Sequence, residues 1–283
     1  MQYYSPLRYP GGKGKLSFYI KNLIEQNGLS DSSYVEPYTG GGAVAFDLLI
    51  NEYVRRIYIN DVDPAIYSFW FSVLNHTDEL CRMIKDVDVD LNNWNLQKHI
   101  IGKPQEYSKL DLGFAAFFLN RTNRSGILKA GVIGGKEQAG KWKINARFNK
   151  SALISRISKI ASYESRIVLT QLDAVDLIID LTKNKKGEAL FYLDPPYYKK
   201  GQGLYRNYYE HDDHVNILNV LKESNLKNWV VSYDYVPEIT EIYKSYRSRI
   251  YSLQYSAQEK RKSDEVMFYS NDIIIPESDI FKI

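Results

Sequence analysis

Cysteine and histidine are scarce in this chain of 283 residues. Cys81 is its single cysteine, so neither an internal disulfide nor a cysteine-based metal site can form. The four histidines are scattered, and we expect no metal. No apolar run approaches the roughly 20 residues that span a bilayer, and the first residues lack the basic patch and apolar segment of a signal peptide. The sequence therefore predicts a cytoplasmic protein without membrane contact.

The composition is that of a globular chain, with 44% hydrophobic and 25% charged residues, enough for one large or two modest domains. The net charge is only +3, but it is unevenly distributed. Between residues 121 and 150, eight basic residues face one acid, Glu137, and five glycines predict a loop or hairpin. Such a segment can approach and neutralise a phosphate backbone, although most isolated basic runs are solvated loops. The basic residues are Arg121, Arg124, Lys129, Lys136, Lys141, Lys143, Arg147 and Lys150.

Short apolar strands alternate with helices in two parts of the chain, which predicts a doubly wound α/β sheet of the Rossmann-like kind. Between about residues 76 and 160 the alternation gives way to a mainly helical and loop-like block. We interpret that block as an inserted domain that carries the basic hairpin, with 1–75 and 161–283 forming the sheet domain. The predicted strands are 34–37, 56–60, 166–170, 189–193 and 228–232, with a closing hairpin of 251–255 and 266–269. The predicted helices are 16–26, 43–50, 64–74, 173–181 and 212–223.

An Asp194-Pro195-Pro196-Tyr197 run directly follows the apolar strand 189–193. The two prolines fix the backbone and carry no N–H, so this turn offers hydrogen-bond acceptors only. Asp194 and the Pro195 carbonyl could both accept from the exocyclic amine of a planar base, and Tyr197 could stack on the ring. Asp-Pro is also a common turn opener, so a purely structural role stays open.

A second motif, Glu36-Pro37-Tyr38-Thr39-Gly40-Gly41-Gly42, links a predicted strand to a helix. Glycines there allow a tight turn and the close approach of a ligand. The next strand ends in Asn60-Asp61, where doubly wound folds hold a ribose through its hydroxyls. Together the two features predict a nucleoside-containing cofactor. We expect Asp63 to cap the following helix instead.

Near the start, Tyr9-Pro10-Gly11-Gly12-Lys13 forms a glycine turn that does not fit the Walker A spacing, which disfavours a phosphate-loop kinase or ATPase. Lys13 could reach a cofactor carboxylate, and Tyr9 could pack on an adenine or a sulfonium. A solvated turn is the alternative.

These motifs, with Leu119-Asn120-Arg121 and Ser125-Gly126 between them, occur in an order that resembles the Dam-type (D12 class, alpha-group) adenine-specific DNA methyltransferases over nearly the whole chain. The resemblance implies S-adenosylmethionine as methyl donor and double-stranded DNA as partner. It also implies that residues 76–160 form a target-recognition domain and that the target adenine is flipped out of the duplex.

The resemblance also implies roles for individual residues. Those expected to be catalytic, in the turn after strand 189–193, are Asp194, Pro195, Pro196 and Tyr197. Those expected to bind the cofactor are Tyr9 (usually tryptophan in the family), Lys13, Glu36, Pro37, Tyr38, Gly40, Gly42, Asp61 and Asp194. Those expected to bind DNA are Arg121, Asn123, Arg124, Ser125, Lys129 and Lys136.

Several alternatives stay open. Members that methylate GATC typically carry an aromatic residue where Arg124 stands and an arginine where Lys129 stands, so we assign no recognition sequence. Methylation of the cytosine 4-amino group, or of adenine in RNA, would use a similar turn, and a non-catalytic DNA-binding protein could share the scaffold. No Pro-Cys dipeptide occurs, which excludes a cysteine attack on cytosine carbon 5. A partner restriction endonuclease and a monomeric or weakly dimeric state in a bacterial or phage-infected cell fit this interpretation.

Overall fold

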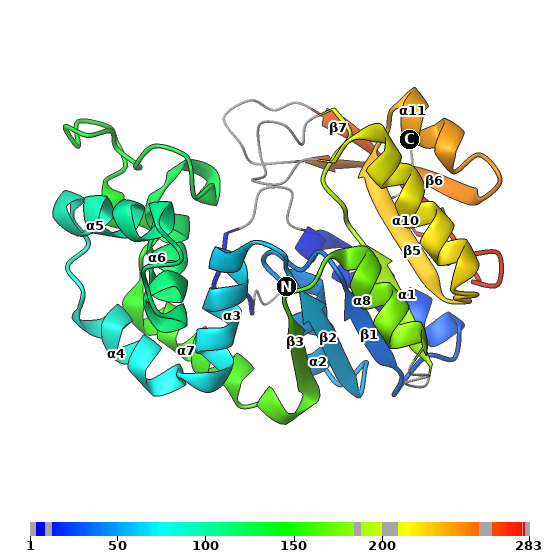
Figure 1. The fold of residues 1–283 in the computed structure, drawn as a ribbon, viewed down its shortest axis with the longest axis horizontal. Helices are drawn as coiled ribbons and strands as arrows, with labels where there is room; N and C mark the ends of the chain where they lie inside the picture. Colours follow the sequence, from blue (N-terminus) through cyan, green and yellow to red (C-terminus); the bar gives the residue numbers. More distant parts are fainter. Residues whose placement is uncertain are drawn as a thin grey trace.

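The computed structural model describes residues 4–8, 13–183, 188–199, 209–254, 262–278 and 280. Within them, seven strands form one sheet in the order β3-β2-β1-β4-β5-β7-β6 (Figure 1). β1 to β5 pair in parallel, while β7 runs antiparallel between β5 and β6. The strands are β1 Ser33–Glu36, β2 Arg56–Asn60, β3 Ile167–Thr170, β4 Ala189–Leu193, β5 Trp229–Asp234, β6 Arg247–Gln254 and β7 Lys262–Tyr269.

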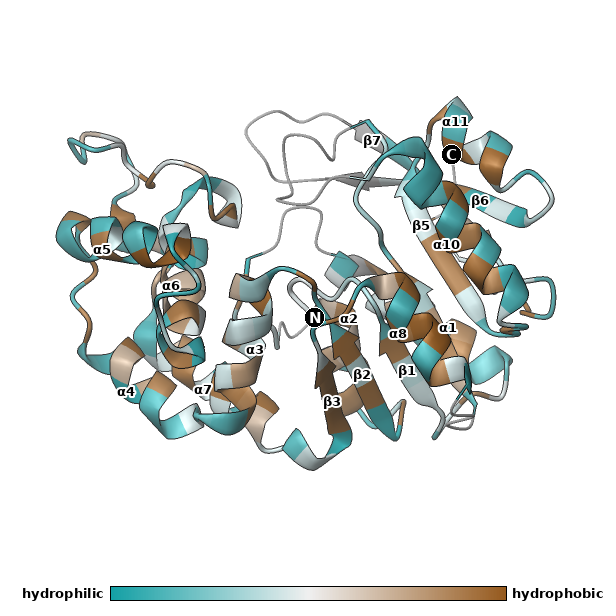
Figure 2. Ribbon diagram, in the orientation of Figure 1, coloured by the Kyte–Doolittle hydropathy of each residue, from teal (hydrophilic) through white to brown (hydrophobic). Residues whose placement is uncertain are grey.

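Consecutive residues of each strand belong to opposite faces of the sheet, and helices cover both faces. Tyr34 and Leu190 belong to one hydrophobic cluster, and their neighbours Val35 and Phe191 belong to the other. The first cluster includes α1 Ser17–Gln26, α2 Ala43–Ile50 and α3 Pro64–Asn75, and the second includes α8 Ala174–Lys183, α10 His211–Glu223 and α11 Pro237–Ile242. Apolar residues are accordingly prominent in strands such as β3 and β5 (Figure 2). The predicted doubly wound sheet is confirmed.

The predicted elements of the sheet domain are present, with shifts at their ends. Asp63 caps α3 as expected, because its Oδ1 accepts from the Ala65 N–H at 2.8 Å. The closing hairpin is longer than predicted, since β6 is an edge strand that begins at exposed polar residues, which carry no apolar signal. Residue 255 of the predicted hairpin lies outside the described residues. The short helix α11, which begins at Pro237, was not predicted.

The block after α3 is helical, as expected, with α4 Thr77–Asp86, α5 Leu91–Gly102, α6 Lys109–Thr122 and α7 Lys150–Ala161 (Figure 1). The helix α6 packs closely on α3, where Phe117 stacks on Phe69 with ring centroids 5.6 Å apart. A Cβ on Gly113 of α6 would lie 2.4 Å from the Ser68 carbonyl oxygen of α3, so only glycine permits this approach. One hydrophobic cluster therefore continues from the sheet into the insertion. The division into two domains stays a prediction.

The predicted basic hairpin is a loop closed by a single antiparallel bridge, between Asn123 and Val132, and not a regular ladder. The Ile133 N–H donates to the Thr122 carbonyl at 2.8 Å, and the Arg124 N–H donates to the Gly131 carbonyl at 3.0 Å. The basic segment also contains two short 3-10 turns, η2 Arg124–Gly126 and η3 Ile144–Arg147. Glycine disfavours strands, because its backbone loses more conformational entropy on folding and it offers no side chain to pack. The glycines of the segment therefore favour such turns.

Over the described ranges, every helix is too short or too polar to cross a bilayer.

The close α3–α6 contact gives a stability test. We expect Gly113→Ala to lower the free energy of unfolding by about 1–3 kcal/mol, because the new methyl group would overlap the backbone of α3. Gly102→Ala at the end of α5 is the matched control, since its Cβ would meet nothing within 4 Å. Urea unfolding measures both variants. An equal effect of the two substitutions would contradict this account of the helix contact.

Candidate active site

The Asp194 side chain stands at the end of β4, at the edge of the sheet where β1 and β5 also end. Its Oδ1 accepts from the Ser232 hydroxyl of β5 at 2.8 Å and lies 3.3 Å from the Lys13 ammonium. The side chain stays 21% exposed, while Pro195 is buried and Pro196 half-buried. We call this arrangement the acceptor corner. Its carboxylate is fixed by two protein partners and still open to a ligand.

A buried network of three side chains supports this corner from behind. Lys13 donates to the Tyr197 hydroxyl at 2.8 Å and to Glu265 Oε2 at 2.5 Å, and Tyr197 donates to Glu265 Oε1 at 2.5 Å. Lys13 is 5% exposed, Tyr197 7% and Glu265 0%. Lys13 is therefore part of the acceptor corner and does not lie on a solvated turn. Because the Tyr197 hydroxyl is held on both sides, its ring has a fixed orientation.

Charge in this region is tightly balanced. Burial raises the pKa of Asp194 to about 6, although the Lys13 cation opposes that rise. Burial would lower the pKa of Lys13, but Asp194 and Glu265 outweigh burial and raise it. Lys13 is thus a permanent cation that keeps Asp194 ionised near neutral pH.

Glu36, at the end of β1, is a buried carboxyl whose Oε2 has no hydrogen-bond partner among the described residues. Burial, with a smaller contribution from Asp194, raises its pKa well above the usual range. An unpaired polar atom in the interior is costly unless a ligand satisfies it. Glu36 therefore fits a ligand group that donates hydrogen bonds, such as an amine.

The glycine turn after β1 is held by Asp61. Gly40 and Gly42 have φ of 47° and 59°, the left-handed region that favours glycine, and a Cβ on Gly42 would lie 2.5 Å from the Phe46 ring. Asp61 Oδ2 accepts from the Gly40 N–H at 2.9 Å. Burial, and secondarily the neighbouring Asp63, raises the pKa of Asp61 to about 7. The glycine turn and Asp61 are thus in direct contact.

Three further residues hold the loops of the site in place, and the sequence analysis did not assign them to it. Asn60 donates to the Pro37 carbonyl at 2.9 Å. Asp234, at the end of β5, accepts from the Tyr198 N–H at 3.0 Å and from the Lys199 N–H at 3.2 Å, which fixes the chain just after the acceptor turn. Glu265 could have been found, because a carboxyl in the apolar strand β7 needs a buried partner.

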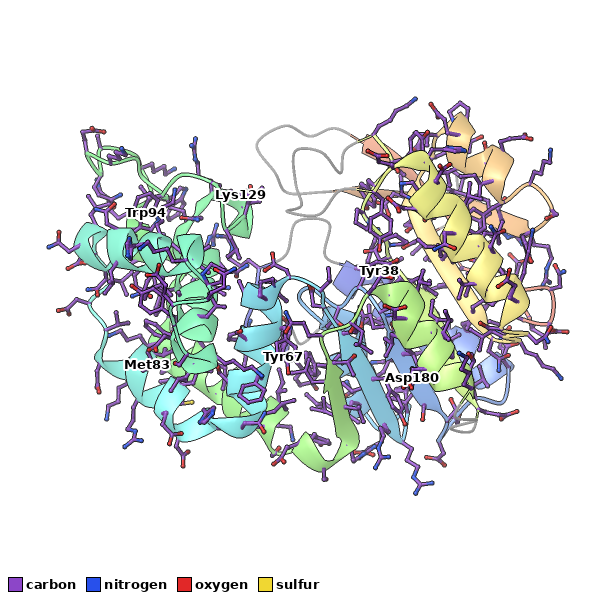
Figure 3. All side chains as sticks on the ribbon, in the orientation of Figure 1. Tyr38, Tyr67, Met83, Trp94, Lys129 and Asp180 are labelled. Atoms are coloured by element: carbon purple, nitrogen blue, oxygen red, sulfur yellow. The ribbon has the colours of Figure 1, made fainter. Side chains whose placement is uncertain are left out.

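Tyr38 also lies at this edge, two residues beyond β1, where its hydroxyl is 3.2 Å from that of Tyr209. Figure 3 shows Tyr38 at the sheet and Lys129 on the insertion, both toward the upper part of the view. The predicted cofactor residue Tyr9 lies outside the described residues.

The six predicted DNA-binding residues divide into three groups. Arg124, Ser125, Lys129 and Lys136 are exposed on the basic loop. Arg121 is half-buried, and its Nε donates to the Arg147 carbonyl at 2.7 Å.

Asn123 differs from the other five, because its side chain is fully buried, and its contact with DNA stays a prediction. Trp94 donates to Asn123 Oδ1 at 2.7 Å, and Asn123 Nδ2 donates to the Ile127 and Leu128 carbonyls at 3.0 Å each. This asparagine therefore fixes the shape of the loop.

Comparison with known proteins agrees with the geometry of this site. Residues 9–259 match the profile of the D12 class N6 adenine-specific DNA methyltransferases. The chain belongs to this family. A Type II methyltransferase, M.MjaIII of Methanocaldococcus jannaschii, is 26% identical over 211 residues, an alignment that covers 68% of each protein. Among solved structures, the rRNA methyltransferase aviRa from Streptomyces viridochromogenes has 14% identity, with a TM-score of 0.41 and coverage of 93% of this chain and 87% of that one.

As a D12 class adenine-specific DNA methyltransferase, the protein acts on adenine in DNA, which decides against the cytosine, RNA and non-catalytic alternatives. Its family also implies S-adenosylmethionine as methyl donor. In the part of the chain that the structure describes, no three His, Cys, Asp or Glu side chains gather into a group that could hold a metal ion.

The buried network gives a second test. We expect Lys13→Met to lower the free energy of unfolding by about 3–5 kcal/mol, because it leaves Glu265 buried beside no cation. The control is Lys103→Met, which breaks an exposed Lys103–Glu106 pair and should cost less than about 1 kcal/mol. Thermal or urea unfolding compares them. The double variant Lys13→Met/Glu265→Gln should recover part of the loss, and the absence of recovery would count against the ion pair as its cause.

Proposed function

We propose that this protein transfers a methyl group from S-adenosylmethionine to the 6-amino group of adenine within a short duplex DNA sequence, with the target base flipped out of the helix. The observation that carries the proposal is the acceptor corner. Asp194 is fixed by Ser232 and Lys13, yet it remains open to a ligand.

The residues at the ends of β1 and β2 fit the proposed cofactor. The unpaired Glu36 Oε2 suits its amine, the glycine turn allows close approach, and the Asp61 carboxylate can accept from ribose hydroxyls. Bound there, S-adenosylmethionine supplies an electrophilic methyl group on its sulfonium sulfur. Pro37 and Tyr38 contribute the wall of the turn, and Lys13 and Asp194 lie where the cofactor and the base would meet.

At the acceptor corner, Asp194 and the Pro195 carbonyl would each accept one hydrogen of the adenine amine. Those two bonds direct the nitrogen lone pair away from the acceptors and toward the methyl group. Tyr197 would stack on the base, and its ring is already oriented by Lys13 and Glu265. The chain thus contributes positioning and fixed dipoles, and no covalent intermediate is required.

Flipping is needed because the 6-amino group of a paired adenine is stacked and hydrogen-bonded inside the duplex. The exposed basic loop supports contact with that duplex. Arg124, Lys129 and Lys136 are cations there, and Ser125 adopts a left-handed φ of 56° at the loop. Strained backbone of this kind is concentrated at functional sites.

The relative M.MjaIII is described as a Type II methyltransferase, and we propose a similar setting in which a partner restriction endonuclease is paired with this protein. A monomeric or weakly dimeric state and a cytoplasmic location stay predictions of the sequence.

The acceptor corner is tested by Asp194→Ala. We expect methyl transfer to fall below detection, because the variant loses the acceptor that orients the amine, while the far-UV spectrum stays near that of the parent. Transfer of labelled methyl groups to mixed-sequence DNA measures the effect, with Lys103→Met as the active control. An active Asp194→Ala protein would refute this role.

The pH dependence of the parent provides a further check on the same residue. Because the pKa of Asp194 is raised to about 6, transfer should decline as the pH falls through that value and the carboxylate takes up a proton. A rate that stays level down to pH ~5 would mean that the ionised acceptor is unnecessary.

The basic loop is tested by Arg124→Ala and Lys129→Ala. Each should weaken duplex binding and lower the slope of log K against log salt by about 0.9, the contribution of one phosphate contact. Exposed Arg82, on α4, provides the control substitution Arg82→Ala. If both loop variants keep the parent slope, the duplex lies elsewhere.

A further inference from the structure

We propose that Arg8, Arg121, Arg147 and Arg156 together bind one phosphate of the DNA backbone, at a site separate from the exposed tip of the basic loop. The inference rests on the proposed function, because it assumes that duplex DNA is the ligand. The four residues come from four parts of the chain: the segment 4–8, the helix α6, the turn η3 and the helix α7.

Backbone carbonyls anchor three of the four guanidinium groups, and one of those carbonyls belongs to the fourth residue, Arg147. Arg156 donates to the Ser5 carbonyl at 3.1 Å, and Arg8 donates to the Asn123 carbonyl at 3.2 Å. Arg121 donates through Nε to the Arg147 carbonyl at 2.7 Å and through a terminal nitrogen to the Pro6 carbonyl at 3.4 Å. Each anchor fixes one arm of its guanidinium group, so the remaining N–H donors are held in place for an acceptor.

The position of Arg8 itself is fixed by Asn120 of α6. The Arg8 N–H donates to Asn120 Oδ1 at 2.7 Å, and Asn120 Nδ2 donates to the Arg8 carbonyl at 2.7 Å. The Gly126 backbone also comes close, since a Cβ there would lie 2.3 Å from the Arg8 carbonyl oxygen. The site is thus built into the junction between the N-terminal segment and the insertion, and it does not depend on free surface side chains.

No carboxylate among the described residues forms an ion pair with any of these four arginines, although most other buried or half-buried cations at the sheet have one. The charges act on one another instead. Burial, followed by Arg8, Arg156 and Arg147, lowers the pKa of Arg121 to about 10. Burial and Arg147 also lower the pKa of Arg8. Holding like charges close together destabilises the folded protein, and a bound anion would offset that repulsion.

A phosphodiester is the anion that fits this setting. Guanidinium groups match the oxygens of phosphate with paired hydrogen bonds, and they do so without reading sequence. Arg147 is exposed and the other three are half-buried, so an oxyanion can enter from the solvent side. Arg8 lies five residues before Lys13 of the acceptor corner, so a phosphate held here would fix the duplex relative to the site of methyl transfer.

The test compares duplex binding by Arg147→Ala/Arg156→Ala with binding by Arg82→Ala, using a labelled mixed-sequence duplex of about 30 base pairs over a series of salt concentrations. Arg121 and Arg8 are left intact, and the unfolding midpoint of the double variant is checked because Arg156→Ala also removes a contact with the Ser5 carbonyl. We expect the double variant to bind about tenfold more weakly at 100 mM salt and its salt slope to fall by about 0.9. A slope equal to that of Arg82→Ala would overturn the proposal.

Tryptophan fluorescence gives an independent signal from the same place. The Arg147 guanidinium lies 5.9 Å from the Trp142 ring, and Trp142 is 60% exposed, whereas Trp70, Trp94 and Trp229 are buried. Duplex binding should therefore reduce quenching of the parent protein by iodide, and Trp142→Phe should remove that effect. Unchanged quenching in a saturated complex would also contradict the site.

Binding and methyl transfer separate the two proposals. Inorganic phosphate serves as a competitor of the duplex, and only weak competition at millimolar concentration is expected because free phosphate lacks the rest of the duplex.

If the parent protein methylates DNA but the arginine variants bind as the control does, only the phosphate site fails. If the parent protein binds duplex with the expected arginine dependence but transfers no methyl group, only the proposed function fails. If it binds no duplex, both fail.

Discussion

The buried ion pair of Lys13 and Glu265 is the interaction on which the rest of the site depends. It joins Lys13, just before α1, to the antiparallel strand β7, and it fixes the Tyr197 hydroxyl and the Asp194 carboxylate in the same contact. A cation at this depth is stable only with carboxylate partners, and each carboxylate there needs the cation. The acceptor corner can therefore be rigid and charged without solvent.

The sheet explains why this network forms where it does. Parallel strands end at one edge, so β1, β4 and β5 bring Glu36, Asp194 and Asp234 to the same side. The antiparallel β7 then places Glu265 beside Asp234, the last residue of β5. The helix α6 packs on α3 through Gly113, which extends the same hydrophobic core into the insertion. The basic loop and the acceptor corner are thus carried by one continuous core.

Much of this arrangement could be predicted from the sequence because its signals are local. Apolar periodicity predicted the parallel strands, and the Asp63-Pro64 pair predicted the start of α3. The position of the glycine turn and of Asp61 at the ends of two neighbouring strands was also visible in the sequence. The partners of Lys13 could not be predicted in this way, because Glu265 lies 252 residues away in sequence and only the fold brings them together.

The burial of Asn123 could not be predicted either. An asparagine in a basic loop suggests a residue that hydrogen-bonds to DNA bases. The Asn123 side chain is buried because it bonds to Trp94 and to carbonyls of the loop, and no local sequence pattern reveals those contacts. The arginine cluster was hidden for the same reason, since its members are spread from residue 8 to residue 156. Long-range polar contacts of this kind are set by tertiary structure and leave no periodic signal.

The most direct test of the central claim is a crystal structure of the protein with a duplex substrate and a non-reactive analogue of S-adenosylmethionine. The account predicts an extruded adenine stacked on Tyr197, with its amine about 2.7–3.2 Å from both Asp194 and the Pro195 carbonyl oxygen. A complex in which the adenine amine binds elsewhere, while Asp194 contacts only the protein, would contradict it.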